Sequence, residues 1–577
     1  MKKIFILSAA IIFSVNVFSQ APNWLWAKRI GGTNADAGYA VAVDVAGNVY
    51  TAGQFRLTVD FDPGIGIFNL TATCGYDMFI SKLDASGNFI WAKSFSCLPG
   101  GGDCSPWALM LDTFGNIYTT GQFARMVDFD PGIGTFALTS AGGIQQDIFI
   151  SKLDSAGNFV WAKSIGGANQ DWGYSITVDA NGNVYTTGFF YGTVDFDPGS
   201  GVFNLSSPSN IAAFISKLDN SGNFIWAKMI NTVTSSGVQG HSIAVDAQQN
   251  VYTTGSFGGT ADFDPGTSNF YMTSNGGDIF VSKLDMGGNF VWAKQMGGTV
   301  DDNGLSIAVD AYANVYTSGT YKDTADFDPN AGTFNLSSAG QEDIFVSKLD
   351  SGGNFTWAKS IGDIYRDFSA ALVLAANSDI YLTGRFEDTV DFDPGSGIFN
   401  LISAGGWDIF VSKLDSAGNF AWAKASGGAD YDRGNAIALN NSGNVYVTGY
   451  FNSPSINFGS DTLINADSSG SVSEIFIVKI DTTDIITGTN DASTSLSMTS
   501  IFPNPATTEV TINFGKEGWC DVRVWNVLGE QVKDLTLTLS KGEGTATIDV
   551  SELMPGIYFV VVRDEENGLV VRKVVKM

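Results

Sequence analysis

Histidine is almost missing from this chain of 577 residues, in which His241 is the single example. One imidazole cannot build a multi-histidine zinc site, and it leaves at most one base for a histidine-dependent catalytic triad. His241 occupies the place that Tyr39 and Tyr174 hold in other copies of an internal repeat, so we interpret it as a packing residue. P-loop, HExxH, EF-hand and nucleophile-elbow motifs are absent as well. These absences argue against most familiar hydrolases.

Positive charge is also scarce. The chain has 31 Lys and Arg against 59 Asp and Glu, which gives a net charge of −28. Phosphate backbones repel such a chain, so we expect no nucleic-acid partner. Charged residues make up only 16% of the sequence and aromatic residues 13%. A chain of this composition buries large cores and is not disordered, which favours a β-rich binding or structural protein.

Long apolar runs are limited to the N-terminus. Lys2 and Lys3 precede an apolar stretch from Ile4 to Phe18, and short side chains lie just before Gln20. This order predicts a signal peptide at residues 1–19, and the run is too short for a spanning helix. We therefore expect no transmembrane segment and a chain that leaves the cytoplasm.

Only four cysteines are present, Cys74, Cys97, Cys104 and Cys520. Cys97 and Cys104 flank a glycine-rich segment, and an oxidising compartment favours a disulfide between them. Free thiols and a metal pair are the alternatives, while Cys74 has no predicted partner. We predict a Cys97–Cys104 disulfide.

An internal repeat decides the fold class. The tripeptide Trp-Ala-Lys recurs with a mean period of 66 residues, beginning at Trp26, Trp91, Trp161, Trp226, Trp292, Trp357 and Trp422. One period predicts four short strands, for example at residues 174–178, 183–187, 213–218 and 223–228, separated by Asp-, Gly- and Asn-rich turns. Four strands in each of seven repeats predict an all-β, seven-bladed β-propeller over residues 20–482.

The order of the strands predicts how the ring closes. The repeat region begins with a strand of the fourth kind, around Trp26, and ends with one of the third kind, at Phe476 to Asp481. The N-terminal strand can therefore complete the last blade and remove exposed sheet edges. The recurring segments Gly-Asn-Val-Tyr-Thr-Thr-Gly and Phe-Ile-Ser-Lys-Leu-Asp resemble β-propeller repeats of secreted bacterial proteins. That resemblance implies the fold and no particular activity.

The C-terminal region has a different pattern. Residues 483–498 are rich in Thr, Ser and Asp and predict a linker, and residues 499–577 predict a small Ig-like β-sandwich. Ile501-Phe-Pro-Asn-Pro505, Val524-Trp-Asn-Val-Leu-Gly529 and Leu553-Met-Pro-Gly-Ile-Tyr558 are similar to the type A C-terminal sorting domain of the type IX secretion system. The resemblance implies the type IX machinery as a partner. It also implies a secreted or outer-membrane-surface protein of a Gram-negative, Bacteroidetes-type bacterium.

Paired carboxylates recur in an Asp-Phe-Asp-Pro motif. Alternate strand residues face the same side, so each pair offers two ligands for a calcium ion. The alternative is structural, because Asp62-Pro63-Gly64 fits a type II turn and Phe61 can pack between blades. The sequence indicates no cofactor other than this possible calcium. The pairs are Asp60/Asp62, Asp128/Asp130, Asp195/Asp197, Asp262/Asp264, Asp326/Asp328 and Asp391/Asp393.

A second set of acids lies on the segments that enter the first strand of each blade. Loops of this kind surround the mouth of a propeller funnel, so we expect these acids and neighbouring aromatic and basic residues to contact a ligand. The alternative is that each aspartate caps a turn in its loop. The candidates are Asp36, Trp107, Asp171, Trp172, Asp302, Arg366, Asp367, Tyr431, Asp432 and Arg433.

Two functional interpretations remain. The first is a non-enzymatic propeller that binds a protein, glycan or cation, which the near-identity of the blades favours. The second is a carbohydrate-active enzyme in which two acids at the mouth act as general acid and as nucleophile or base. The sequence singles out no pair of carboxylates for that chemistry, so we assign no catalytic residue.

Overall fold

The computed structural model describes residues 22–234, 236–482, 498–502, 507–514, 518–526, 531–539, 545–564 and 569–576. All regular structure in these residues is β, which confirms the predicted all-β class with propeller repeats. None of them forms a helix long and apolar enough to cross a membrane. The predicted signal peptide and nearly all of the predicted linker lie outside the described residues. One compact unit covers Ala21–Thr483, and the C-terminal strands belong to another.

In the larger unit, the strands pair as successive antiparallel groups of four, which we call blades and number along the chain, and a short pairing of residues 231–232 with 261–262 joins two of them into one sheet. Blade one contains β2 (Ala37–Val43), β3 (Val49–Phe55), β6 (Asp77–Leu83) and β7 (Phe89–Phe95). Blade two contains β8 (Cys97–Leu111), β9 (Ile117–Asp128), β11 (Gln146–Leu153) and β12 (Phe159–Ile165). Blade three contains β13 (Trp172–Val178), β14 (Val184–Asp195), β15 (Asn204–Leu218) and β16 (Phe224–Thr232). Blade four contains β17 (Val238–Val245), β18 (Val251–Asp262), β19 (Tyr271–Leu284) and β20 (Phe290–Met296). Blade five contains β21 (Asn303–Val309), β22 (Val315–Asp326), β23 (Asn335–Leu349) and β24 (Phe355–Ile361). Blade six contains β25 (Phe368–Leu374), β26 (Ile380–Phe386), β29 (Asp408–Leu414) and β30 (Phe420–Ser426). Blade seven contains β31 (Asp432–Leu439), β32 (Val445–Phe451), β35 (Glu474–Ile480) and β1 (Trp24–Ile30).

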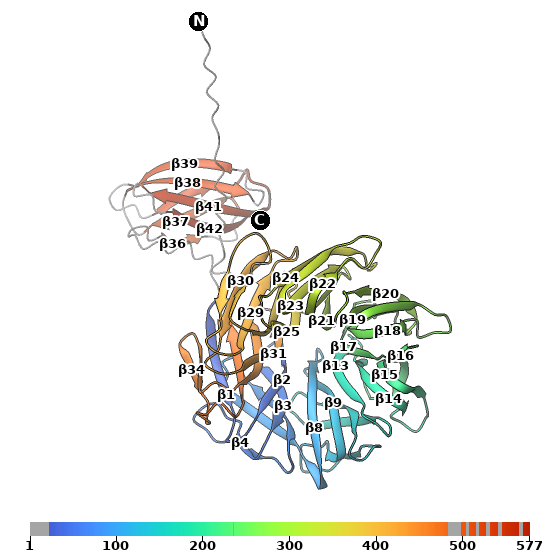
Figure 1. The fold of residues 1–577 in the computed structure, drawn as a ribbon. Coiled ribbons are helices and arrows are strands. Elements are labelled where there is room, and N and C mark those ends of the chain that lie inside the picture. The colour runs from blue at the N-terminus through green and yellow to red at the C-terminus, as the bar shows by residue number, and fades with distance from the viewer. Residues whose placement is uncertain are drawn as a thin grey trace. The chain divides into compact units, whose positions relative to one another are not determined.

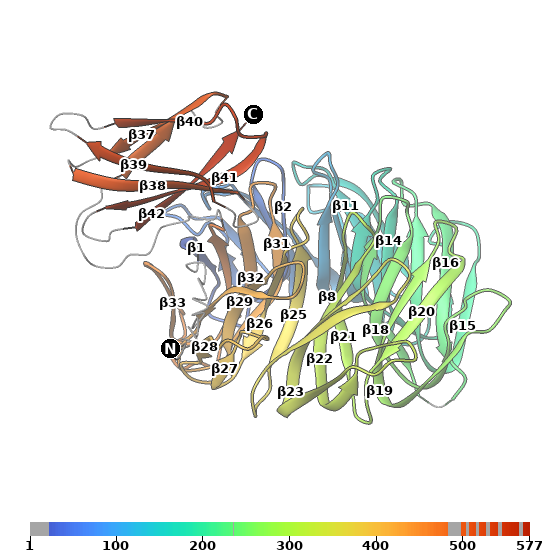
Figure 2. The ribbon, with the colours of Figure 1, turned by 90° about the horizontal axis from the view of Figure 1, so that it is seen from above.

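The blades form a closed ring (Figure 1). Their first strands, β2, β8, β13, β17, β21, β25 and β31, each contact the next one, and β31 returns to β2. The N-terminal strand β1 pairs antiparallel with β35, so both ends of the repeat region meet in one blade, as the marker order predicts. After a turn of 90° the ring is seen edge-on, and strands of neighbouring blades, such as β18 and β21, lie side by side (Figure 2).

Short hairpins extend the blades at their outer side. They contain β4 (Thr58–Asp60) with β5 (Asn69–Thr71), β10 (Ala137–Thr139) on β9, β27 (Thr389–Asp391) with β28 (Asn400–Ile402), and β33 (Ser455–Phe458) with β34 (Asp461–Ile464). Each hairpin of the Asp-Phe-Asp-Pro type buries its central phenylalanine, as Phe61 and Phe392 illustrate.

The repeated residues explain why each blade adopts the same form. In blade three, the Tyr185 ring packs edge-to-face on Trp226 at 6.3 Å, and Lys217 Nζ lies 4.9 Å above the same ring. The Tyr185 hydroxyl donates to Asp179, whose other carboxylate oxygen accepts backbone N–H groups of the turn between β13 and β14. Trp226 Nε1 donates to the Met286 carbonyl of the next blade. These contacts join a turn, a sheet and a neighbouring blade.

The C-terminal unit has two sheets. One contains β36 (Met498–Phe502), β37 (Glu509–Phe514) and β40 (Thr545–Asp549), and the other β38 (Gly518–Asn526), β39 (Gln531–Leu539), β41 (Gly556–Asp564) and β42 (Leu569–Lys576). Buried residues come from both sheets, including Val510, Ile548, Val524 and Val560. An Ig-like topology for this unit remains a prediction.

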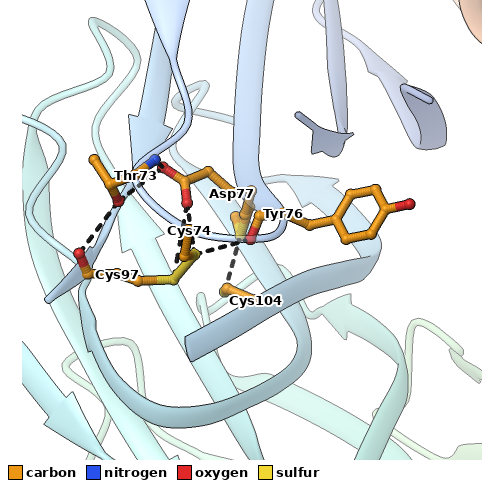
Figure 3. The surroundings of a disulfide bond; sticks show 7 residues. Thr73, Cys74, Tyr76, Asp77, Cys97 and Cys104 are labelled. Atoms are coloured by element: carbon orange, nitrogen blue, oxygen red, sulfur yellow. Dashed lines mark hydrogen bonds between the residues drawn. A yellow bond between two sulfur atoms is a disulfide. The ribbon is translucent and has the colours of Figure 1, made fainter. Parts of the chain in front are cut away.

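The predicted Cys97–Cys104 disulfide is wrong. Cys97 joins Cys74, with Cα atoms 6.0 Å apart, and Cys104 is a buried free cysteine (Figure 3). The segment expected to be a loop is part of β8, where Cys97 lies opposite Val127 and Cys104 opposite Phe123 of β9. Four strand residues span about 13 Å, whereas a disulfide bridges Cα atoms up to about 7 Å apart. Strand pairing therefore separates these two cysteines.

Candidate functional site

Each first strand contains one unpaired residue at the same place. The pairing with the second strand shifts by one residue there, for example between Gly38 and Ala40 of β2, which is a β-bulge. Bulges redirect a side chain out of the sheet pattern and are common beside binding sites. The seven residues at these positions are Tyr39, Trp107, Tyr174, His241, Leu305, Ala370 and Asn435.

All seven bulge residues border a single cavity of about 310 Å³, together with Phe368 and Arg433. We call this cavity the funnel. Every bulge residue is half-buried, so its side chain is partly accessible. A volume of this size lies at the lower end of the range for small-molecule sites. The ring therefore directs seven side chains of six residue types towards one space.

One side of the funnel is aromatic. The Tyr39 and Trp107 rings lie 5.0 Å apart, Trp107 and Tyr174 lie 6.2 Å apart, and Tyr174 and His241 lie 5.6 Å apart. Trp172 stacks on Trp107 with a ring separation of 6.4 Å and an interplanar angle of 26°. Four consecutive blades thus supply a continuous aromatic arc.

His241 belongs to this arc. Its Nδ1 lies 3.0 Å from the Gly304 carbonyl oxygen, which can only accept, so Nδ1 carries a hydrogen. Burial lowers the pKa of His241 below its ordinary value, which favours the neutral ring. The packing interpretation is therefore incomplete, because His241 also borders the funnel.

The other side of the funnel is basic. The Arg433 guanidinium lies 4.8 Å from the Phe368 ring centre, and the Arg385 guanidinium lies 5.1 Å from the same centre. Arg385 also covers Trp407 at 3.6 Å. Burial and the neighbouring charge of Arg433 lower the pKa of Arg385 to about 10, and burial lowers the pKa of Arg433. Each side chain has a solvent-inaccessible Nε without a hydrogen-bond partner.

A second cavity of about 430 Å³ lies beside blades one and seven and shares Tyr39 with the funnel. The predicted residue Tyr431 borders it, 4.8 Å from the Trp407 ring. Arg366 borders neither cavity. It is more than half exposed and forms an ion pair with Glu342 at 2.8 Å. Of the predicted aromatic and basic residues, Trp107 and Arg433 border the funnel, and Trp172 packs against Trp107.

The expected ring of accessible acids at the mouth is wrong. Asp36, Asp171, Asp302, Asp367 and Asp432 are all fully buried, although Asp36 adjoins the second cavity. Their oxygens accept backbone N–H groups: Asp171 accepts from Gly167 of the preceding inter-blade loop at 2.8 Å and from Tyr191 of β14 at 3.0 Å. Burial raises the pKa of Asp36, Asp171 and Asp302 to about 7 and that of Asp367 to about 8. These aspartates hold loops together, as the capping alternative predicts.

A further set of buried acids was not foreseen. It lies two residues before the repeated phenylalanine of the third strand and comprises Asp77, Asp147, Asp278, Asp343, Asp408 and Glu474. In four of these, Asp147, Asp278, Asp343 and Asp408, Oδ1 is inaccessible and has no hydrogen-bond partner. Burial raises the pKa of Asp147, Asp278 and Asp408 to about 6 and that of Asp343 to about 7. The recurring Asp-x-Phe spacing was the available indication.

The Asp-Phe-Asp-Pro pairs do not lie on continuous strands, so the geometric premise of the calcium prediction is wrong. In blade one, β4 ends at the first acid, Asp60, and the second acid, Asp62, lies beyond the strand. The two carboxylates therefore do not face one side as alternate strand residues would. In the same way β9, β14, β18, β22 and β27 end at their first acids, and the second acids Asp130, Asp197, Asp264, Asp328 and Asp393 lie outside the strands.

Each acid of these pairs instead accepts backbone N–H groups of its own turn. Asp60 Oδ1 accepts from Asp62 at 3.1 Å and Phe68 at 2.8 Å, and Asp62 Oδ1 accepts from Gly64 at 2.8 Å. This pattern favours the structural alternative, in which the aspartates stabilise a turn. Asp130, Asp197, Asp264, Asp328 and Asp393 accept in the same way from Gly132, Gly199, Gly266, Asn330 and Gly395, respectively.

The grouping of possible metal ligands adds no support for calcium at these pairs. Within the described parts of the chain, the one cluster of three His, Cys, Asp or Glu side chains close enough to share a metal is Cys74, Asp77 and Cys97. That cluster contains the disulfide and none of the paired aspartates. Calcium usually takes six or more oxygen ligands. Calcium binding by the pairs remains a prediction.

Apart from Trp107, the bulge residues were not predicted as site residues, because the repeat was recognised from the residues that its copies share. Residues that flank the inner glycine differ from blade to blade, as Tyr39, His241 and Asn435 do, while the surrounding residues recur. Variation at one fixed position of a near-identical repeat was the available indication. It identifies the place where the blades stop being equivalent.

Comparisons with known proteins agree with this architecture. A beta-propeller repeat model matches residues 25–54 and 160–188, and a secretion system C-terminal sorting domain matches residues 500–577. An uncharacterized WD repeat-containing protein of Acanthamoeba polyphaga mimivirus is 26% identical over 515 residues, covering 75% of this chain and 36% of that protein. The regulatory protein FlaEY of Caulobacter vibrioides is 28% identical over 142 residues, covering 25% and 14%.

The chain thus spans about a third or less of the length of these curated relatives. A solved Bacteroides caccae protein of unknown function is similar with a TM-score of 0.29 and 9% identity, covering 61% of this chain and 91% of that one. The sorting domain confirms the predicted location and partner class, since it indicates passage through a type IX secretion system. The chain contains β-propeller repeats and a type IX C-terminal sorting domain, which indicates a protein that is secreted or held at the outer-membrane surface.

Proposed function

We propose that the propeller is a non-enzymatic module that binds a glycan in the funnel. The observation that carries this proposal is the difference between the seven bulge residues, which border one cavity in an otherwise repeating ring. A scaffold alone gives no reason for this position to vary while its surroundings recur. A ligand contacted by all blades at once does give such a reason.

The chemistry of the arc favours a sugar ring. Tyr39, Trp107 and Tyr174 offer flat apolar surfaces together with hydroxyl or indole N–H groups, and such amphipathic rings suit ligands with one apolar face and polar edges. Asn435 adds an amide at the cavity edge. A concave site with aromatic walls and few polar groups is typical of small-ligand recognition rather than of a flat protein interface.

Binding is favoured over hydrolysis by the residues that border the funnel. Glycoside hydrolysis uses two carboxyl groups on either side of the scissile bond, and the funnel lining contains neither Asp nor Glu. The acids considered for that chemistry, such as Asp302 and Asp367, have their oxygens engaged by backbone N–H groups. The enzyme hypothesis therefore lacks its proposed acid–base pair.

The test is a polysaccharide panel with the purified full chain, scored for retention and for released reducing ends. We expect retention without products, and a loss of at least tenfold in affinity for Trp107→Ala. The matched control is Tyr312→Ala, because Tyr312 is an exposed aromatic residue in a turn beyond the end of β21. Reducing ends from the wild type, or equal losses in both variants, would contradict the proposal.

A further inference from the structure

Two arginines at the funnel of this strongly acidic protein have no carboxylate partner among the residues that the structure describes. Arg433 borders the funnel, and Arg385 of the adjacent blade meets it at Phe368, which borders the funnel too. Ion pairs among the described residues include Arg29–Glu474, Lys82–Asp44, Arg366–Glu342 and Lys413–Asp379. Neither Arg385 nor Arg433 belongs to any of them.

We propose that these two arginines bind the carboxylate of an acidic sugar, so that the ligand of the funnel is a uronate-containing glycan. This inference rests on the proposed function and specifies its ligand. A guanidinium matches the planar geometry of a carboxylate and binds it with two parallel hydrogen bonds. Sulfate esters and neutral sugars are the alternatives that the experiment below separates.

The electrostatic environment supports an external anion. Partly buried positive charges that stand close together without a counter-charge destabilise one another, and a bound anion relieves that cost. Glu342 is the carboxylate whose charge raises the pKa of Arg385, and it already forms an ion pair with Arg366 at 2.8 Å. The polar neighbours of Arg433 are the hydroxyl groups of Tyr450 and Tyr39, and neither is a carboxylate. The funnel lining therefore supplies no internal anion for these two side chains.

The aromatic arc and the arginines suit two parts of one ligand. Tyr39 borders the funnel with Arg433, and the charge of Arg433 acts on the Tyr39 hydroxyl. A sugar ring against Tyr39 or Trp107 therefore has Arg433 on the same cavity wall, within reach of a substituent. The net charge of −28 repels polyanions at long range, so binding of a uronate polymer reports the local site rather than general attraction.

The experiment measures the affinity of the full chain for polygalacturonate, alginate and hyaluronan, and for each polymer after chemical reduction of its carboxyl groups to alcohols. Neutral glucans and sulfated dextran complete the panel. We expect at least one uronate polymer to bind and its carboxyl-reduced form to bind at least tenfold more weakly. Arg433→Gln and Arg385→Gln should each lower the affinity for the acidic polymer at least tenfold. Arg433→Lys should retain more affinity than Arg433→Gln.

Lys163→Gln is the matched control, because it removes one positive charge from the outer strand β12 and should leave affinity unchanged. Thermal melting of each variant checks that the fold is retained. Equal affinity for acidic and reduced polymers, or retention of neutral or sulfated polymers alone, overturns the uronate proposal and leaves glycan binding in place. Retention of none of the polymers overturns both proposals.

Discussion

Two parts of each blade differ in how far their residues recur from blade to blade. Around Tyr185, the contacts with Trp226, Lys217 and Asp179 recur in nearly every blade. At the funnel end of the same sheet, one bulge residue is tyrosine, another leucine and another asparagine. The repeated part determines how blades fold and join, and the varied part determines what the ring can contact. Mutations should therefore separate stability from binding according to their place along the strand.

The largest effect is expected in the repeated part. Tyr185→Ala removes a fully buried ring together with its contacts to Trp226 and Lys217, and it leaves Asp179 without one donor. We expect a loss of about 3–5 kcal/mol in the free energy of unfolding, measured by denaturant titration. Tyr185→Phe is the control and should lose about 1 kcal/mol, the value of the hydroxyl hydrogen bond. A loss for the alanine variant no larger than that of the control would contradict the assigned role of this ring.

The disulfide should have the next largest effect. Blade two has Cys104 where five blades have the buried loop aspartate, and the Cys74–Cys97 bond joins the segments on either side of β6 and β7. For a sequence separation of 23 residues, the loop-entropy model gives about 3 kcal/mol. We expect Cys74→Ser to lower stability by about this amount, with Cys104→Ser as the matched single-cysteine control. Peptide mapping that finds Cys104 in a disulfide would contradict the assignment.

The two sets of buried acids should respond differently to neutralisation. Asp432 uses both oxygens, with Gly428, Asn452 and Ser453 as donors, whereas Asp408 Oδ1 has no partner. Asp432→Asn should therefore lose about 1–3 kcal/mol. The change that Asp408→Asn makes in the free energy of unfolding should be about 1 kcal/mol more favourable at pH 8 than at pH 5. The reason is that the folded pKa of Asp408 is about 6, so the wild type buries a charged carboxylate at pH 8. Equal losses in both variants at both pH values would remove this distinction.

The same acids predict a pH dependence for the wild type. Their folded pKa values, about 6 to 8, exceed the ordinary value of 3.8, so folding takes up protons between these limits. The stability that these groups contribute is complete below about pH 4 and is lost as the pH rises through 6 to 8. We expect the melting temperature to fall from pH 5 to pH 8. A melting temperature that rises over this range would show that other groups or bound ions compensate the carboxylates.

The smallest effect on stability is expected at the bulges. Leu305→Tyr and His241→Tyr install the residue that blades one and three have at that position. Because these side chains are half-buried at the edge of the funnel, we expect stability changes of about 1 kcal/mol or less. Glycan affinity should change several-fold in the same variants. Losses as large as that of Tyr185→Ala would mean that the bulges belong to the framework.

The repeat period was sufficient to predict strands, turns and ring closure because each blade contains its own turn residues and buried aromatics. Trp26 and Phe476 even indicate which strands must meet. The sequence alone failed where partners depend on strand register. Cys97 and Cys104 are close in sequence, yet β8–β9 pairing separates them. Asp302 lies on a loop in sequence, yet it is fully buried, so its exposure could not be inferred from its position.

The pairing of β1 with β35 also constrains the order of folding. In the same blade, Ala27 N donates to Asp461, a partner 434 positions away in the sequence. Each blade contains its own local contacts, whereas the pairing of β1 with β35 joins segments remote in the sequence, and such contacts carry a larger loop-closure entropy cost. Until the N-terminal strand pairs, the edge of β35 that it covers is exposed. Removing the N-terminal strand should leave blade seven with three strands and the edge of β35 exposed.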